Sequence, residues 1–375
     1  MAAHWEHFLK RWTDAGLIEP AAAARVRAHE AAQENAEGLR WPVLLAIALG
    51  GILLGAGVLL FVAAHWEALS PAIRFGLVLL LVAVFHVAGA LLADRFPALS
   101  TTLHAVGTVS LGAGIFLTGQ IFNLQEHWPA ALMLWAAGAW LAWALLRDWP
   151  QAALAALLTP AWLAGEWIEA TRGFSGGEKI LPAGLLLLAI TYLTAVTPEK
   201  ETSTRKALLW IGAVAVLPLA AAVPFFNQFA SRQLNSLPES YYIFGWTVSI
   251  FVPLLTAWRL RGSAAWINVI ASLWVITLGM TGQTSRPDAD LGMYAAWAVG
   301  AVGLVAWGVR EARKAWINIG VAGFALTVLF FYFSNVMDKL GRSASLIGLG
   351  ALFLLGGWWL ETMRRRLVAR LEQAA

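Results

Sequence analysis

Side chains able to exchange protons or bind cations lie at the ends of three apolar segments of the chain. If these ends meet in space, two imidazoles and several carboxylates would form a polar cluster suited to a proton-coupled site, a cation-binding vestibule or a metal. Their spacing matches no fixed set of metal ligands, so the sequence predicts no metal and no other cofactor. The residues are His65 and Glu67 after the first segment, Gln120, Asn123, Glu126 and His127 after the third, and Glu166 and Glu169 at the end of the fifth.

The same polar ends also have a purely structural explanation. Histidine, tryptophan and glutamate are common where membrane helices reach the lipid headgroups, and Trp66 and Trp128 would serve there as interfacial anchors. A solute or ion site and an ordinary helix rim both stay open at the level of sequence.

Histidines inside apolar segments are costly and therefore more informative. His86 lies near the middle of the second segment and His104 near the start of the third. For His86 we weigh a buried neutral imidazole bonded to a carbonyl against a proton relay or a substrate contact. For His104 we expect a solvated position at the interface.

Small residues predict which helices approach closely. Gly51 and Gly55 are four residues apart in the first segment, and Gly107 and Gly114 share a face of the third. Without β-carbons on these faces, two helices can pack backbone to backbone. We therefore expect the first and third segments to lie side by side, with their polar ends adjacent.

The composition indicates the class of protein that positions these residues. Hydrophobic residues make up 59% of the chain and charged residues 13%, and the mean hydropathy is +0.68. Unbroken apolar runs of about twenty residues recur, which is the length that a helix needs to cross a bilayer, whereas barrel strands would be shorter and alternating. We therefore expect an all-α polytopic membrane protein.

Residues 1–40 are polar and lack the apolar core of a signal peptide, so the first apolar segment is expected to target the chain to the membrane. Helical stretches are predicted at 4–15, ended by Gly16, and at 20–36, opened by Pro20. They would form a short cytosolic hairpin able to bind a partner protein. Its expected core is Leu9, Trp12, Leu17 and Val26.

Residues 41–154 and 155–360 are expected to form two membrane parts, followed by a basic cytosolic tail at 361–375. Together they contain roughly twelve apolar segments long enough to cross. The fifth is the weakest, because it contains Pro160 and Glu166, and it would be re-entrant or broken if it did not cross. The segments are 41–64, 75–93, 103–122, 128–146, 152–168, 180–197, 207–226, 241–258, 265–282, 291–309, 315–333 and 344–360.

Positive charge predicts the orientation. Most of the 26 lysines and arginines fall on the side of the N-terminus in this arrangement, which by the positive-inside rule is the cytoplasm. Both termini are therefore predicted to be cytoplasmic. Arg364, Arg365 and Arg366 in the tail would contact anionic lipid headgroups. Such membrane-proximal charges explain the isoelectric point near 9.6 without a nucleic acid partner.

A short repeat favours the same alternation. Ala265-Trp266-Ile267-Asn268 recurs as Ala315-Trp316-Ile317-Asn318, each time just after a basic loop. The repeat indicates tandem helical hairpins in the C-terminal half. Compositional bias explains a match of this length equally well.

Three longer motifs carry a resemblance to a known family. Residues 12–18 (WTDAGLI) precede the first apolar segment, 61–67 (FVAAHWE) end it, and 111–124 (LGAGIFLTGQIFNL) end the third. With these motifs in order, residues from about 9 to 154 resemble predicted bacterial membrane proteins with a domain of unknown function, number 2157. The resemblance implies a location in the bacterial cytoplasmic membrane and a helical architecture, and it implies no catalytic residues.

These observations favour a protein that binds or transports a small solute or ion through a polar site between its helices. The alternative is a scaffold or sensor in the envelope that binds a partner through the N-terminal hairpin. A third possibility is an intramembrane enzyme acting on a lipid, with His65 and Glu67 as a general base pair. Phosphate loops, nucleophile elbows and zinc-protease motifs are missing, and the lack of cysteine excludes disulfides and thiolate metal sites, so an enzyme is the less favoured class.

Overall fold

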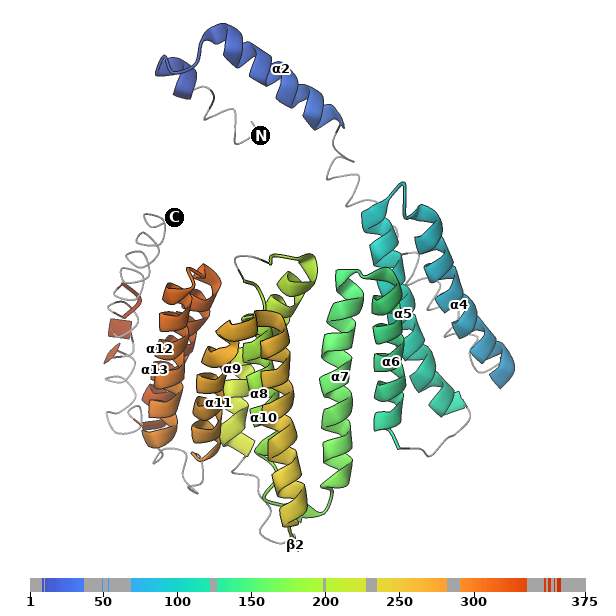
Figure 1. Cartoon of the computed structure of the whole chain (residues 1–375), viewed down its shortest axis with the longest axis vertical. Coiled ribbons are helices and arrows are strands. Elements are labelled where there is room, and N and C mark those ends of the chain that lie inside the picture. Colours follow the sequence, from blue (N-terminus) through green and yellow to red (C-terminus); the bar gives the residue numbers. More distant parts are fainter. Residues whose placement is uncertain are drawn as a thin grey trace. The chain divides into compact units, whose positions relative to one another are not determined.

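The computed structural model describes residues 9, 11–36, 49, 53, 69–121, 127–197, 200–226, 235–281, 291–335 and several positions between 347 and 358 (Figure 1). The chain divides into two compact units, Met1–Arg74 and Phe75–Ala375. Each unit is described by itself.

The first unit contains the expected N-terminal helices. A helical turn ends at Gly16, whose φ of +70° is the left-handed conformation typical of a helix C-cap. Helix α2 then covers Pro20–Ala36, as the sequence predicts. Leu9 is buried against a small interior that also contains Ala23.

The prediction that the core of this hairpin also contains Trp12, Leu17 and Val26 is wrong. Their exposed fractions are 41%, 74% and 41%, in that order. Two short helices offer too little surface to cover large side chains as well as small ones. The described part of the hairpin therefore presents an apolar surface.

The second unit is built from helices. They are α4 (Pro71–Leu92), which begins just before the unit, α5 (Pro97–Ile121), α6 (Pro129–Leu146), α7 (Trp149–Ala170), α8 (Ile180–Leu193), α9 (Ser203–Phe226), α10 (Glu239–Arg261), the 3-10 turn η3 (Gly262–Ala265), α11 (Trp266–Gly279), α12 (Leu291–Arg310) and α13 (Lys314–Asn335). Two-residue strands, β1 (Phe174–Ser175) and β2 (Asn235–Ser236), pair in parallel. The all-α class is therefore as expected.

Seven helical stretches of the described chain are long and apolar enough to cross a bilayer. They are α4, α5, α6, α9, α12, α13 and the continuous stretch Glu239–Gly279, which combines α10 with α11. Most of the expected segments 41–64 and 344–360 lies outside the described residues. Helix α7 is unbroken despite Pro160, and its 22 residues are about 33 Å long.

Helix α8 departs most from the expected spans. The sequence predicts a crossing over 180–197, but the helix ends at Leu193 after 14 residues, and it is therefore about 21 Å long. Nine of the 14 residues of α8 are buried and none is exposed, and Leu186, Leu187 and Leu193 have exposed fractions of 1% or less. A helix that is apolar all round belongs in the interior of a helix bundle, and α9, α10 and α11 pack around it.

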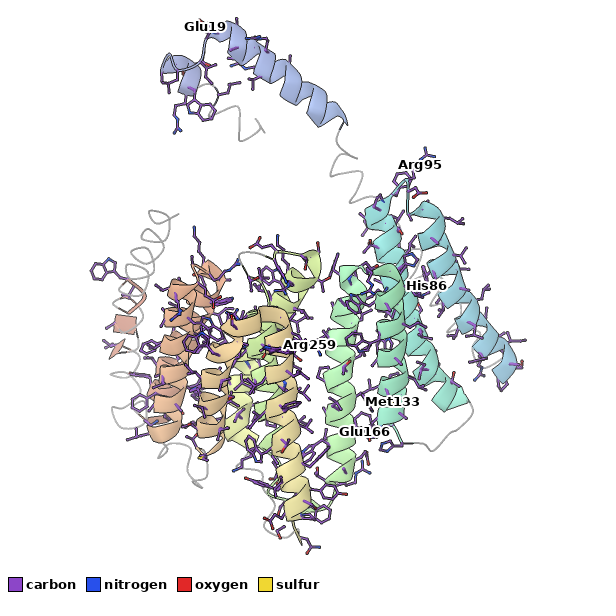
Figure 2. All side chains as sticks on the ribbon, viewed as in Figure 1. Glu19, His86, Arg95, Met133, Glu166 and Arg259 are labelled. Atoms are coloured by element: carbon purple, nitrogen blue, oxygen red, sulfur yellow. The ribbon has the colours of Figure 1, made fainter. Side chains whose placement is uncertain are left out.

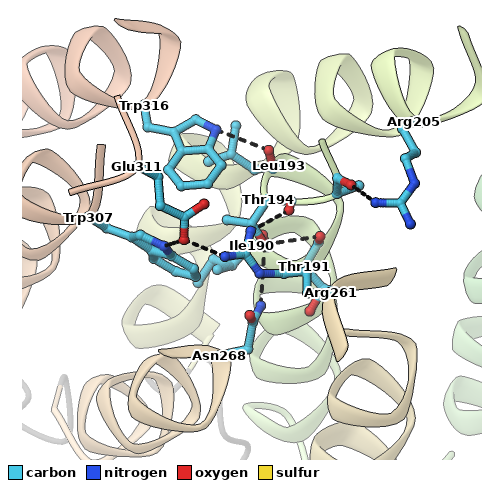
Figure 3. A network of polar contacts seen from close by, with 11 residues as sticks. Ile190, Thr191, Leu193, Thr194, Arg205, Arg261, Asn268, Trp307, Glu311 and Trp316 are labelled. Atoms are coloured by element: carbon cyan, nitrogen blue, oxygen red, sulfur yellow. Dashed lines mark hydrogen bonds and ion pairs between the residues drawn. The ribbon is translucent and has the colours of Figure 1, made fainter. Parts of the chain in front are cut away.

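The last carbonyl groups of α8 are hydrogen-bonded by donors from other helices (Figure 3). The Trp316 indole on α13 donates to the carbonyl of Leu193 at 3.1 Å. Arg261 on α10 donates to that of Thr194 at 2.7 Å, and Arg205 on α9 to that of Ala195 at 2.7 Å. A helix end in apolar surroundings requires such partners, because no water is there to replace them.

Arg261 is held in place by a second set of contacts. Its side chain is 1% exposed and forms an ion pair with Glu311, which follows α12. Glu311 also accepts a hydrogen bond from the Trp307 indole at 2.7 Å. The guanidinium lies over the rings of Trp307 and Trp316, with 5.4 and 5.8 Å to the ring centres. The ends of α8, α10, α12 and α13 therefore meet around one buried cation.

These contacts also show which loops share an end of the bundle. Arg313, after α12, donates to Glu201, before α9, at 2.8 Å, so the loops after α8, α10 and α12 lie together. At the opposite end, β1 after α7 pairs with β2 before α10. The helices from α8 to α13 therefore alternate in direction, as the sequence predicts.

The two copies of the Ala-Trp-Ile-Asn repeat occupy corresponding places at the start of α11 and α13. Their environments differ, because Trp316 is fully buried whereas Trp266 is 48% exposed. The asparagines show the opposite pattern, because Asn268 is buried and Asn318 exposed. Both copies therefore contact the end of α8 through different residues: Trp316 donates to the carbonyl of Leu193, and the Asn268 amide donates to the hydroxyl of Thr194 at 3.3 Å.

Replacing Arg261 with methionine is expected to lower the free energy of unfolding by roughly 3–5 kcal/mol, because it leaves a buried carboxylate unpaired. Arg259→Met is the matched control, since the Arg259 side chain is exposed on the same helix. Thermal unfolding in detergent measures both. Adding Glu311→Leu to Arg261→Met should recover part of the loss, and equal melting of the Arg261 and Arg259 variants would contradict the role of the pair.

The contact between Glu201 and Arg313 is expected to depend on pH. The hydrogen bond from Arg313, aided by the charges of Arg313 and Lys206, lowers the pKa of Glu201 below its ordinary value. A lowered carboxyl pKa stabilises the folded state at neutral pH, and this stabilisation disappears as pH falls through the folded pKa. The difference in Tm between wild type and Glu201→Gln should therefore be small but positive at pH 7, fall as pH drops below the ordinary glutamate pKa of about 4.3, and vanish below the folded pKa. A difference as large at pH 3 as at pH 7 would contradict this assignment.

Candidate functional site

Two histidines from neighbouring membrane helices meet in the second unit. The Nδ1 atoms of His86 on α4 and His104 on α5 are 3.1 Å apart, and the ring centres are 5.3 Å apart. Figure 2 labels His86 on α4. A hydrogen bond between two such nitrogens needs one proton, which one ring donates and the other accepts. His104 is only 7% exposed, so it is not the solvated interfacial residue that the sequence predicts.

Glycine makes room for each imidazole on the opposite helix. A β-carbon at Gly107 would lie 2.8 Å from Nε2 of His86, and one at Gly89 would lie 2.9 Å from Nε2 of His104. The arrangement is reciprocal, because each helix carries a histidine followed three residues later by a glycine, at 86 and 89 and at 104 and 107. Antiparallel packing places each ring against the glycine of its neighbour.

The glycine face of α5 thus packs against α4. A β-carbon at Gly114 would lie 2.3 Å from Cγ1 of Val78 on α4. The sequence predicts the first apolar segment as the neighbour of this face, but Gly51 and Gly55 in that segment lie outside the described residues. The small residues of α5 therefore bring the second and third apolar segments together.

A carboxylate lies within electrostatic range of both rings. Asp148 caps the N-terminus of α7, where it accepts a hydrogen bond from the backbone amide of Gln151 at 3.3 Å. Burial raises the pKa of Asp148, while that hydrogen bond and the charges of His104 and His86 oppose the shift. A partly buried carboxylate beside two imidazoles provides a second group able to hold a proton.

Gln151 adds an unusual feature to the start of α7. Its side chain is fully buried, yet neither its amide nitrogen nor its amide oxygen has a partner within the part of the chain that the structure describes. Buried amides are almost always hydrogen-bonded. Among the described residues, this side chain therefore adds an unpaired polar group to the helix end that Asp148 caps.

The polar groups after the third apolar segment also meet those at the end of the fifth. This contact lies at the C-terminal ends of α5 and α7, away from Asp148. His127 Nε2 lies 2.6 Å from Glu166 Oε2, and Glu166 accepts a second hydrogen bond from the Trp162 indole at 2.9 Å. The Trp128 indole donates to Glu169. These groups are exposed or half-buried, so they form a polar rim.

The other residues of the expected cluster are not placed. Gln120 lies in the last turn of α5, and the described part of the structure does not include its side chain. The remaining candidates lie outside the described residues: His65, Trp66, Glu67, Asn123, Glu126, Arg364, Arg365 and Arg366. Among the residues that are described, no group of three or more histidine, aspartate and glutamate side chains is arranged to hold a metal.

Sequence reasoning did not predict the contact between His86 and His104, although the sequence contains a signal for it. On two consecutive segments a glycine follows a histidine by three residues, and hydropathy does not reveal this spacing. The antiparallel packing of α4 against α5 shows that the repeated spacing places each histidine against the glycine of the other helix.

Gly107→Ala is expected to destabilise the protein by about 1–3 kcal/mol, because the new methyl group would overlap the His86 ring. Gly76→Ala is the matched control, since a β-carbon at Gly76 on α4 meets nothing within 4 Å. Thermal unfolding in detergent measures the difference. Adding His86→Ala to Gly107→Ala should restore part of the loss, and no recovery in this double variant would show that the ring is not what the methyl group meets.

Comparison with known proteins agrees with the sequence motifs. No curated protein and no solved structure matches the chain at a significant level. The chain is thus a multi-pass membrane protein, and residues 10–152, which include His86, His104, Asp148 and Gln151, match the family of predicted membrane proteins with domain of unknown function 2157.

Proposed function

We propose that this protein exchanges protons at the His86–His104 pair and uses the exchange to move a small solute or ion across the membrane. The observation that carries the proposal is the distance of 3.1 Å between the two Nδ1 atoms. Ionisable side chains inside membrane helices are costly and commonly mark ion pathways or proton relays. Imidazole is the group whose charge changes near neutral pH.

The surroundings of the pair support a role beyond packing. Gly89 and Gly107 lack the β-carbons that would overlap the two rings. The rings therefore fit between the helices and face each other. Asp148 and the unpaired amide of Gln151 extend the polar region toward the start of α7. Asp148 is the group at this end that can hold a proton near the pair.

The outer mouth of the proposed path is the rim formed by His127 and Glu166. The two residues lie at 2.6 Å, at the end of the α5, α6 and α7 helices away from Asp148. His65, Glu67, Gln120, Asn123 and Glu126 belong to the same proposed mouth by their position in the sequence.

We further propose roughly twelve spans in a bacterial cytoplasmic membrane, with both termini in the cytoplasm. The basic loops after α8, α10 and α12 share one end of the bundle, which by the positive-inside rule is the cytoplasmic end. Arg364, Arg365 and Arg366 in the tail are then placed to contact anionic headgroups.

A scaffold or sensor is the second candidate, favoured by a different observation. Trp12, Leu17 and Val26 are exposed on the N-terminal hairpin. Exposed apolar side chains on a small helical element are typical of a surface that binds another protein. This function would reside in the first unit, so deletion of residues 1–38 separates it from transport.

Proton flux in proteoliposomes tests the proposed function. The protein is reconstituted with a pH-sensitive dye inside the vesicles, and a sodium gradient or a potassium diffusion potential is imposed. The wild type should carry protons faster than protein-free vesicles, and His86→Gln with His104→Gln should reduce the rate roughly tenfold, because the amide cannot take up a proton. Thr102→Ala, an exposed position on α5, is the control.

Two results would overturn the proposal. One is a double variant that carries protons as fast as the wild type, and the other is a wild type that carries none under either gradient. Deletion of residues 1–38 should leave the flux unchanged, whereas a protein whose activity resides in the hairpin would lose that activity on deletion.

A further inference from the structure

An apolar cavity of about 260 Å³ lies between α8, α9, α11, α12 and α13. Its walls include Val216 on α9, Trp274 on α11, Trp297 on α12 and Phe330 on α13. None of these helices carries His86 or His104, which lie on α4 and α5. The cavity is larger than the apolar cavities of about 150 Å³ that bind benzene in other proteins.

The polar atoms in the wall are already hydrogen-bonded. The Trp274 indole donates to the carbonyl of Ala296 and the Trp297 indole to that of Ala220, both at 2.8 Å. The Thr327 hydroxyl donates to the carbonyl of Gly323 at 2.8 Å. With these donors occupied, the wall presents hydrocarbon, and a matching guest is a hydrocarbon chain.

The cavity opens sideways, toward the surface that faces lipid. Ile270, Val299 and Phe330 line it and are 53%, 65% and 54% exposed. They lie on α11, α12 and α13, in stretches suited to cross the bilayer. A guest would therefore enter from the membrane interior, where acyl chains are the hydrocarbon present.

A cationic site lies above the cavity on the same helices. The guanidinium of Arg310 is 5.2 Å from the ring centre of Trp266. Arg310 follows Trp307 of the cavity wall by three residues, and Trp266 precedes Ile267 of the wall by one, so both lie within one helical turn of the cavity, up to about 5 Å along the axis. Arg310 forms no ion pair with any other residue that the structure describes.

We propose that this region binds one anionic phospholipid, with an acyl chain in the cavity and the phosphate at Arg310 and the Trp266 indole. The guanidinium fork is suited to a phosphate, and the cavity begins within one helical turn of Arg310, so one lipid can contact both. A free phosphate would not use the cavity, and an uncharged hydrocarbon would not use Arg310. The site lies outside the histidine pair, so the proposal does not depend on transport.

Gly303→Leu is the sharpest variant for filling the cavity. A β-carbon at Gly303 meets nothing within 4 Å, whereas one at Gly300 would overlap Trp274 at 2.2 Å. A leucine at 303 can therefore occupy the entrance without displacing a helix. Gly76→Leu on α4 is the matched control, since its β-carbon also meets nothing within 4 Å.

Native mass spectrometry of the full chain with added phosphatidylglycerol measures binding. Gly303→Leu should weaken the tightest lipid-binding step roughly tenfold, about 1.4 kcal/mol, while Gly76→Leu leaves it unchanged. Arg310→Gln should abolish the preference for phosphatidylglycerol over phosphatidylcholine, and inorganic phosphate should not compete with the bound lipid. Unchanged binding by Gly303→Leu, or competition by phosphate, would overturn the proposal.

Photolabelling of the wild type in vesicles provides a test that does not depend on the stability of a variant. A phosphatidylglycerol with a photoreactive group in its acyl chain should label α11, α12 and α13 at residues that line the cavity, more than the exposed surface of α4. Equal labelling of α4 and the cavity wall would overturn the proposal.

Discussion

The carbonyl groups at the end of α8 need hydrogen-bond donors, because this helix ends after 14 residues among apolar neighbours. Its last turn satisfies part of the need through the amide and hydroxyl of Thr194, which both bond the carbonyl of Ile190. The carbonyls of Leu193, Thr194 and Ala195 depend on Trp316, Arg261 and Arg205. Each donor comes from a different helix. The hydrogen bonds that the end of α8 requires therefore hold α9, α10 and α13 beside it.

Arg261 couples this requirement to charge. A buried guanidinium is tolerated only with a counter-charge, and Glu311 supplies it from the loop after α12. The ion pair brings Trp307 and Trp316 together over the cation. Trp307 also lines the apolar cavity, as does Ile190 of α8, so the polar network and the cavity share walls. The apolar cavity lies where α12 and α13 carry glycine residues instead of larger side chains.

The two polar features of the second unit belong to different parts of the chain. The histidine pair, Asp148 and Gln151 lie within residues 10–152, which match the family. The α8 network and the cavity lie beyond that match. Proton exchange and lipid binding are thus proposed for separate helices, and the variants that probe one leave the other intact.

Much of the architecture follows from local sequence. Apolar runs predict membrane helices because the free energy of burial depends on the residues of each run alone, and Gly16 and Pro20 mark the N-terminal helices through their backbone preferences. Local patterns do not specify where an apolar run stops being helical, so the early end of α8 at Leu193 and the burial of Arg261 are visible only in three dimensions. The same holds at the candidate site. The sequence identified His86 as costly and left open whether the polar ends meet, and the structure brings His127 and Glu166 together. The partner of His86 depends on which helix lies beside α4. The packing of each imidazole against the glycine of the neighbouring helix selects this partner. Because the contact joins two segments, neither segment specifies it alone.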